Sequence, residues 1–227
     1  MSRYLMPLSL LNSWRRIYEP HEYSEGQSYR SFSHDLHEGR SRSYSDSIKL
    51  SSLGLTSGRI LPKNIAWGLK APVHKIMDIV WGREVWGEIE RGIARGTAPQ
   101  IAQEIQLYKD KTIGGINFLL YGILDYLKEG IIYDIRSTER YEIGQFCESI
   151  EHPFYFELCP EAHMFEYIVA DAWSYSDGYN TDTEYEVFSE QYRRPENCSV
   201  LERTITEFME FLEFHNLKRV YFEKWGV

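Results

Sequence analysis

Apolar residues recur every three to four positions in four stretches of the chain, which is the spacing of one face of an α-helix. These stretches are 7–18, 73–96, 143–158 and 199–214. In the second stretch Gly82 separates two apolar sets, so we expect two helices or one helix broken at that residue. In the last stretch Ser199 is suited to cap the N-terminus of a helix.

Alternation of apolar and polar residues, the pattern of strands, fills much of the remaining chain. The expected strands cover 105–107, 116–127, 131–135, 164–173, 184–192 and 218–225. Short glycine-containing connections join the first three, which predicts a three-stranded meander. Residues 24–57 contain frequent serine and no sustained period, so we expect a loop or an insertion there.

The order of these elements predicts an α/β (α+β) fold with a mixed central sheet flanked by helices, because it lacks the regular alternation of a parallel βαβ protein. A chain of 227 residues with 43% hydrophobic content can bury a sizeable core. We therefore expect one domain over 1–227.

Net charge and cysteine content limit the class of protein that the chain can be. The formal net charge of −9 argues against a protein that coats nucleic acid nonspecifically, although a local basic channel remains compatible with it. The three cysteines form no C-x-x-C motif, so no disulfide framework is expected. No run of 18 apolar residues is present, which predicts no membrane span and a cytoplasmic protein.

Two aspartates flank a predicted hairpin in the strand-rich region. If Glu129 and Gly130 form a two-residue turn, Asp125 lies opposite Asp134 on the neighbouring strand. Like charges that face each other across a sheet are destabilising, and a divalent cation removes the conflict. Arg136 shares the face of Asp134 because side chains alternate along a strand.

This pattern suits phosphodiester hydrolysis. Hard carboxylate oxygens hold Mg²⁺, the metal activates water, and a fixed cation offsets the charge that grows on the phosphate. The alternative is that both aspartates simply face solvent. Against it, Asp125 shares its strand face with Tyr121 and Ile123, and Asp134 shares its face with Ile132.

Three motifs resemble the PD-(D/E)XK nuclease superfamily. They are G-x-x-D from Gly122 to Asp125, the strand IIYDIRST with D-x-R where D/E-x-K is usual, and E-x-x-x-Y from Glu151 to Tyr155 where Q-x-x-x-Y is usual. The resemblance covers roughly 73–194. Within the superfamily it is similar to the RecB-type and CRISPR-adaptation nuclease branch, which includes small phage nucleases.

This resemblance implies a restriction-endonuclease-like fold and a DNA nuclease, of exonuclease type, that depends on Mg²⁺ or Mn²⁺. It would serve phage or bacterial DNA replication, recombination or defence in the cytoplasm of a bacterial host cell. The implied metal ligands are Asp125, Asp134 and the backbone carbonyl of Ile135, with an acidic residue of the preceding helix for which Glu84, Glu88 and Glu90 are candidates and Glu88 is chosen. The implied catalytic set adds Arg136, Glu151 and Tyr155. Basic residues that could contact a strand are Arg15, Arg16, Lys109, Lys111 and Arg140.

Two departures from the family pattern support a second hypothesis. Arg136 cannot be deprotonated to act as a base, and Glu151 adds negative charge where the family has an amide. The chain could instead be a catalytically inactive nuclease-fold protein that binds a protein or nucleic acid, such as a phage inhibitor of a host defence complex (anti-CRISPR type). A metal between Asp125 and Asp134 would favour catalysis, whereas an Arg136 salt bridge in that place would favour binding alone.

Overall fold

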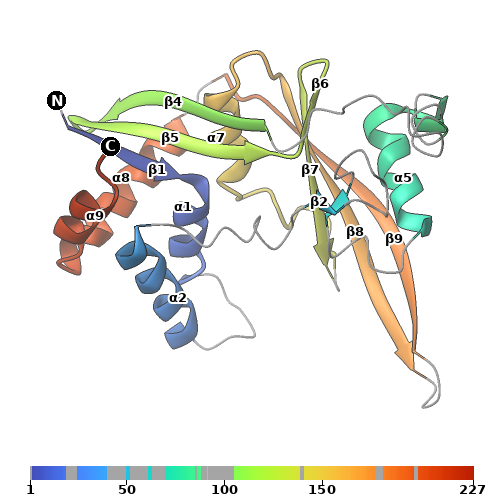
Figure 1. Cartoon of the computed structure of the whole chain (residues 1–227), viewed down its shortest axis with the longest axis horizontal. Helices are drawn as coiled ribbons and strands as arrows, with labels where there is room; N and C mark the ends of the chain where they lie inside the picture. The colour runs from blue at the N-terminus through green and yellow to red at the C-terminus, as the bar shows by residue number, and fades with distance from the viewer. Residues whose placement is uncertain are drawn as a thin grey trace.

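The computed structural model describes residues 2–18, 25–39, 50–51, 61–62, 70–84, 86–87, 91, 105–138, 141–176, 181–196 and 199–227. Within these residues, helices flank two mixed β-sheets, so the predicted α/β (α+β) class is confirmed. Figure 1 shows α1, α2, α8 and α9 gathered at one end of the molecule and α5 at the other. Among the described helices, none is both long and apolar enough to cross a bilayer.

The first sheet has three strands in the order β1-β5-β4. Its members are β1 (Arg3–Pro7), β4 (Ile105–Ile113) and β5 (Ile116–Leu124). β4 and β5 form the antiparallel hairpin that the sequence predicts, whereas β1 pairs with β5 in parallel and was not predicted. The sheet is therefore mixed.

The second sheet has four strands in the order β6-β7-β8-β9. Its members are β6 (Tyr126–Lys128), β7 (Ile131–Thr138), β8 (Met164–Ser176) and β9 (Thr181–Arg193). β7 and β8 run parallel, and α7 (Glu151–Leu158) lies in the crossover between them. β2 (Leu50–Ser51) and β3 (Leu61–Pro62) pair separately.

The predicted three-stranded meander is divided between the two sheets. β5 belongs to the first sheet and β6 to the second, and Asp125 is the single residue between them. Its side chain accepts a hydrogen bond from the backbone N–H of Ile135, so a carboxylate replaces a strand partner there. A continuous strand over 116–127 was wrong for that reason.

Three predicted helices occur close to their expected places. They are α1 (Leu8–Arg15), α5 (Lys70–Trp81) and α8 (Ser199–Phe214). α5 ends at Gly82, whose positive φ of 82° interrupts the helix as expected. The apolar stripe of α8 is buried over Leu201, Ile205, Phe208, Met209 and Leu212.

Three other predictions were wrong. Residues 25–38, expected as loop, form α2 (Glu25–Glu38), which buries Phe32 and Leu36 four positions apart. Residues 218–225, expected as a strand, contain α9 (Lys218–Lys224), whose Tyr221 is buried and donates its hydroxyl to the Leu5 carbonyl. Of the helix expected over 143–158, only α7 forms, and the preceding residues are turns.

The core lies on both faces of the second sheet. One face carries Ile132, Phe165 and Val169 into a large cluster with α1, α2, α7 and α8. The opposite face carries Ile135 and Ile168 into a smaller cluster with α5. Even-numbered residues of β7 therefore face α7, and this alternation decides which side chains reach the site.

Candidate functional site

Four polar side chains meet where α7 covers the second sheet. Asp134 and Arg136 lie on the face of β7 toward α7, as their spacing predicts. Tyr167 stands beside Asp134 because β7 and β8 pair in parallel at that register. Glu151, the first residue of α7, completes the group. We call these residues, together with Asp125, the acidic centre.

Arg136 bridges the two carboxylates of this group. Its Nε lies 2.5 Å from Asp134 Oδ2, and its Nη2 lies 2.6 Å from Glu151 Oε2. Asp134 and Glu151 are each only 8% exposed. Glu151 is held further by Asn12 Nδ2, 2.9 Å from Oε1, and by the Tyr167 hydroxyl, 3.2 Å from Oε2. The guanidinium thus occupies the space between the carboxylates.

The hairpin that brings Asp125 to this region matches its prediction. Glu129 and Gly130 both have positive φ, 52° and 77°, as a two-residue hairpin turn requires. Lys128 pairs with Ile131 directly across the turn. The predicted register is therefore confirmed through this hairpin.

Asp125 itself does not pair in the strand ladder. The ladder ends at Tyr126, and Asp125 Oδ2 accepts a hydrogen bond of 2.9 Å from the Ile135 N–H. Asp134 and Asp125 are close enough for each to feel the charge of the other.

Charges in the acidic centre are unbalanced. Burial raises the pKa of Asp134 well above its usual value, and Glu151 and Asp125 add to this although Arg136 opposes it. Burial lowers the pKa of Arg136, but the neighbouring carboxylates outweigh it and the guanidinium stays charged. Two carboxylates thus contact one cation, and Asp125 adds a third negative charge nearby. Within the described residues, the partner of Asp134 Oδ2 is Arg136 Nε, in an ion pair that lacks hydrogen-bond geometry.

Tyr155 and Gly122 contribute to the packing of α7 against β5, next to the acidic centre. The Tyr155 hydroxyl donates to the Ile123 carbonyl on β5. A Cβ on Gly122 would come 2.9 Å from Leu158 Cδ1 and 3.0 Å from Tyr155 Cε1. The glycine of the G-x-x-D motif therefore lets α7 lie close against β5, which sets the position of Glu151.

The predicted metal ligands are brought together in part. Asp125 and Asp134 lie close enough to interact electrostatically and Asp125 contacts the Ile135 N–H, whereas Glu88 lies outside the described residues. No three His, Cys, Asp or Glu side chains in the described ranges are grouped as a metal site. The predicted donors, two carboxylates and one backbone oxygen, are hard oxygen ligands of the kind Mg²⁺ and Mn²⁺ prefer. These donors suit a divalent cation in kind, although Arg136 Nε already lies against Asp134 Oδ2.

Sequence reasoning missed Asn12 and Tyr167, the two neutral residues that hold Glu151. Tyr167 lies in an alternating strand and could have been assigned to a face, but its place beside Asp134 depends on the parallel register of β7 and β8. Asn12 lies 139 residues from Glu151 in sequence, and no local pattern marks it.

His152, the residue after Glu151, is packed rather than available for catalysis. Its ring stacks on Tyr192 with centroids 4.4 Å apart, and burial lowers its pKa to about 4. An unfolded histidine titrates near pH 6.5, so between these values the unfolded chain binds one more proton than the folded chain. Folding stability therefore falls as pH falls through this range.

We predict that His152→Phe reduces this acid sensitivity. At about pH 5 the wild type should lose about 2 kcal/mol of stability through His152 relative to neutral pH, whereas the variant keeps the ring stack and binds no proton. Urea unfolding of both proteins at about pH 5 and pH 7 measures the difference. Equal pH dependence in the two proteins would contradict a neutral, buried His152.

Fold and site together define a mixed α/β protein with a buried cluster of carboxylates around one arginine. No family model matches the chain, and no curated protein matches it. A solved structure described as "Crystal structure of SSO0001" is similar over 92% of this chain and 76% of that one, with 11% identity and a TM-score of 0.43. A likeness of this strength carries no argument about fold or function.

Proposed function

We propose that the protein is a metal-dependent DNA nuclease, of the exonuclease type implied by its resemblance to the PD-(D/E)XK superfamily. The observation that carries this proposal is the excess of negative charge in the acidic centre. Asp125, Asp134 and Glu151 face a single guanidinium, and the pKa of Asp134 is raised by burial and by the two other carboxylates. A divalent cation would neutralise that excess without protonating Asp134.

Each of these residues of the acidic centre then has a chemical role. Asp125, Asp134 and the Ile135 carbonyl would hold Mg²⁺ or Mn²⁺, which lowers the pKa of bound water and so supplies a nucleophile. Arg136 would offset the negative charge that develops on the phosphate, because its guanidinium stays charged. Glu151 keeps that guanidinium oriented through its contact with Nη2. Arg136 itself cannot accept the proton of the water.

A divalent cation held by Asp134 would compete with Arg136 for that carboxylate. Arg136 Nε contacts Asp134 Oδ2, whereas Nη2 contacts Glu151. Loss of the first contact leaves the second in place, so the arginine keeps a partner when the metal binds. The phosphate of the substrate would then be the next partner of its freed Nε.

We predict that Mg²⁺ or Mn²⁺ both stabilises the protein and starts cleavage of end-labelled DNA. At a concentration 100 times its dissociation constant, a ligand that binds the folded state alone adds about 2.7 kcal/mol of stability. Thermal unfolding with metal or with EDTA measures binding independently of activity, and gel analysis of single- and double-stranded DNA measures cleavage. Absence of both a metal-induced shift and cleavage would overturn the proposal.

The second candidate is a nuclease-like protein that binds a partner without hydrolysis, such as an inhibitor of a host defence complex in a bacterial cytoplasm. The bridge from Arg136 to Asp134 and Glu151 favours it, because this is the arrangement expected when the arginine fills the metal position. The near-complete burial of both carboxylates favours it too. A protein that shows neither metal shift nor cleavage, yet gains cleavage in Arg136→Lys, would belong to this class.

A further inference from the structure

Arg136 divides one edge of its guanidinium between two carboxylates. Its Nε lies 2.5 Å from Asp134 Oδ2, and its Nη2 lies 2.6 Å from Glu151 Oε2. The N–H groups of Nε and Nη2 point in the same direction, so a single carboxylate can bind both of them, one with each oxygen. This bidentate contact is the stronger arrangement, and the division between two carboxylates therefore needs a physical reason.

Asn12 holds the Glu151 oxygen that a bidentate contact would need. An ionised carboxylate only accepts hydrogen bonds, and the Asn12 amide nitrogen Nδ2 donates to Glu151 Oε1 over 2.9 Å. The Tyr167 hydroxyl donates to the other oxygen, Oε2, which is also the oxygen that Arg136 contacts. Turning Oε1 toward Nε of Arg136 would break the bond to Asn12. Glu151 therefore offers Arg136 a single oxygen, and Asp134 is left as the partner of Nε.

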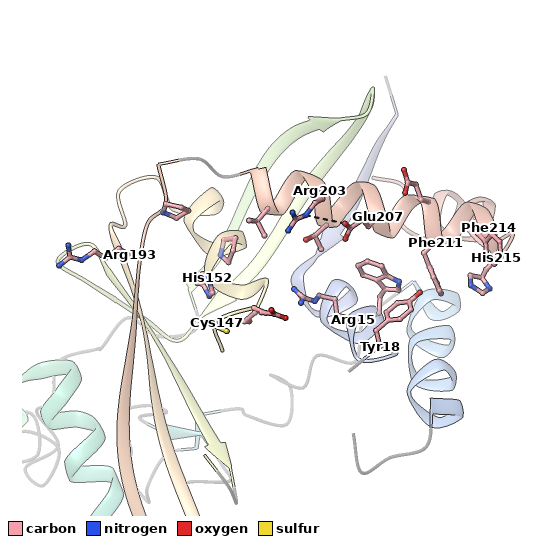
Figure 2. Close-up of a pocket in the computed structure, with 18 residues that line it drawn as sticks. Arg15, Tyr18, Cys147, His152, Arg193, Arg203, Glu207, Phe211, Phe214 and His215 are labelled. Carbon is pink, nitrogen blue, oxygen red and sulfur yellow. Dashed lines mark ion pairs between the residues drawn. The ribbon is translucent and has the colours of Figure 1, made fainter. Parts of the chain in front are cut away.

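Asn12 reaches the acidic centre from α1, while its neighbours in sequence face elsewhere. Arg15 of α1 and Tyr18 just beyond it line a groove of about 1260 Å³ (Figure 2). Among the described residues that line this groove, none belongs to the acidic centre. Ser13 donates to Asp35 on α2. A change at Asn12 therefore leaves the groove and the bond between α1 and α2 in place.

We propose that Asn12 is a positioning residue that keeps Arg136 shared between Asp134 and Glu151. The proposal rests on the metal-dependent function proposed above, because it concerns how easily a divalent cation enters. Such a cation at Asp134 displaces Nε of Arg136. While Asn12 holds Oε1, the displaced N–H finds no second oxygen on Glu151. Asn12 thus keeps the chain's own arginine against Asp134 and makes metal binding weaker than the carboxylates alone would allow.

Asn12→Leu tests this role, because leucine keeps the branched shape of the side chain and has no hydrogen-bonding group. The variant should be less stable than the wild type in EDTA, because the bond to Glu151 is lost. It should nevertheless bind Mn²⁺ about tenfold more tightly, the worth of one added hydrogen bond to a charged group, because Arg136 then takes both Glu151 oxygens. Thermal unfolding in EDTA and isothermal titration with Mn²⁺ measure the two effects, and Asn12→Ala replaces Asn12→Leu if the latter does not fold.

Two variants separate this role from a general loosening of the site. Tyr167→Phe also removes a hydrogen bond from Glu151, but from Oε2, so Oε1 stays with Asn12 and any gain in Mn²⁺ affinity should be much smaller. Ser13→Ala removes the bond from α1 to Asp35, outside the acidic centre, and should lower stability with no gain in Mn²⁺ affinity.

The role of Asn12 is also measurable without any metal. Asp134→Asn takes the charged partner away from Nε of Arg136, as a bound cation would. In EDTA its effect on the folding equilibrium constant should therefore be about tenfold more favourable in the Asn12→Leu background than in the wild type. Additive effects of the two substitutions would overturn the proposal whether or not the wild type binds Mn²⁺.

The Mn²⁺ titrations distinguish failure of this role from failure of the metal-dependent function. If the wild type binds Mn²⁺ but Asn12→Leu binds it no more tightly, or Tyr167→Phe gains as much affinity, the role of Asn12 is rejected and the metal site is kept. If the wild type binds no Mn²⁺, the metal-dependent function is rejected, and the comparison in EDTA decides the role of Asn12 alone.

Discussion

Asp134→Asn is expected to abolish metal-dependent cleavage, by at least about 100-fold, and to stabilise the metal-free protein at the same time. Asp134 is buried and its pKa is raised by burial and by its carboxylate neighbours, so the charge costs stability unless a cation is present. The neutral amide removes that cost. A gain of about 0.5–2 kcal/mol is typical when a strained functional residue is replaced.

Cleavage assays and thermal unfolding, each with Mn²⁺ and with EDTA, measure both effects of Asp134→Asn. The expected pattern is a higher melting temperature in EDTA and no further rise with Mn²⁺. Asp110→Asn is the control, because Asp110 is an exposed aspartate whose partner Arg3 is also on the surface. A variant that keeps a full Mn²⁺ shift would show that the metal binds elsewhere.

Arg136→Gln is expected to destabilise the protein by about 3–5 kcal/mol, the cost of leaving buried charges without their partner. Its guanidinium bridges Asp134 and Glu151, which lie on different elements and are both nearly inaccessible to solvent. Urea unfolding at neutral pH measures the loss. Arg136→Lys should recover part of it, because an ammonium keeps the charge but cannot contact both carboxylates with a planar fork.

A double variant tests the cause of this loss. Adding Asp134→Asn to Arg136→Gln should restore more stability than Asp134→Asn adds to the wild type, because one of the two uncompensated carboxylates is then neutral. Arg219→Gln removes a surface arginine and should change stability by no more than about 1 kcal/mol. Additive effects of the two centre variants would mean that Arg136 does not stabilise Asp134 electrostatically.

Local patterns predicted the parts of the fold that local geometry determines. The turn at Glu129 and Gly130 follows from the backbone freedom of glycine, and the shared face of Asp134 and Arg136 follows from the two-residue period of a strand. The apolar stripe of α8 was equally plain, because it repeats at helical spacing over several turns.

Elements whose conformation depends on partners distant in sequence could not be predicted from local patterns. The residues of α9 alternate well enough for a strand, but they form a helix whose Tyr221 contacts the N-terminal segment, a partner that lies more than 200 residues away in sequence. The break at Asp125 arises because its carboxylate takes the Ile135 N–H, and this ends the strand that the apolar run would continue. The role of Asn12 could not be predicted for the same reason, since its partner Glu151 lies in another element.

The acidic centre is assembled from contacts of very different sequence separation. Asp125 and Ile135 are 10 residues apart and joined by a tight turn, whereas Asn12 and Glu151 are 139 apart. Short loops close at little entropic cost, and distant contacts form late in folding. We therefore expect Asp125 and Asp134 to approach each other early in folding, when the hairpin forms. Glu151, which holds Arg136, should become fixed by Asn12 only when α1 packs against α7.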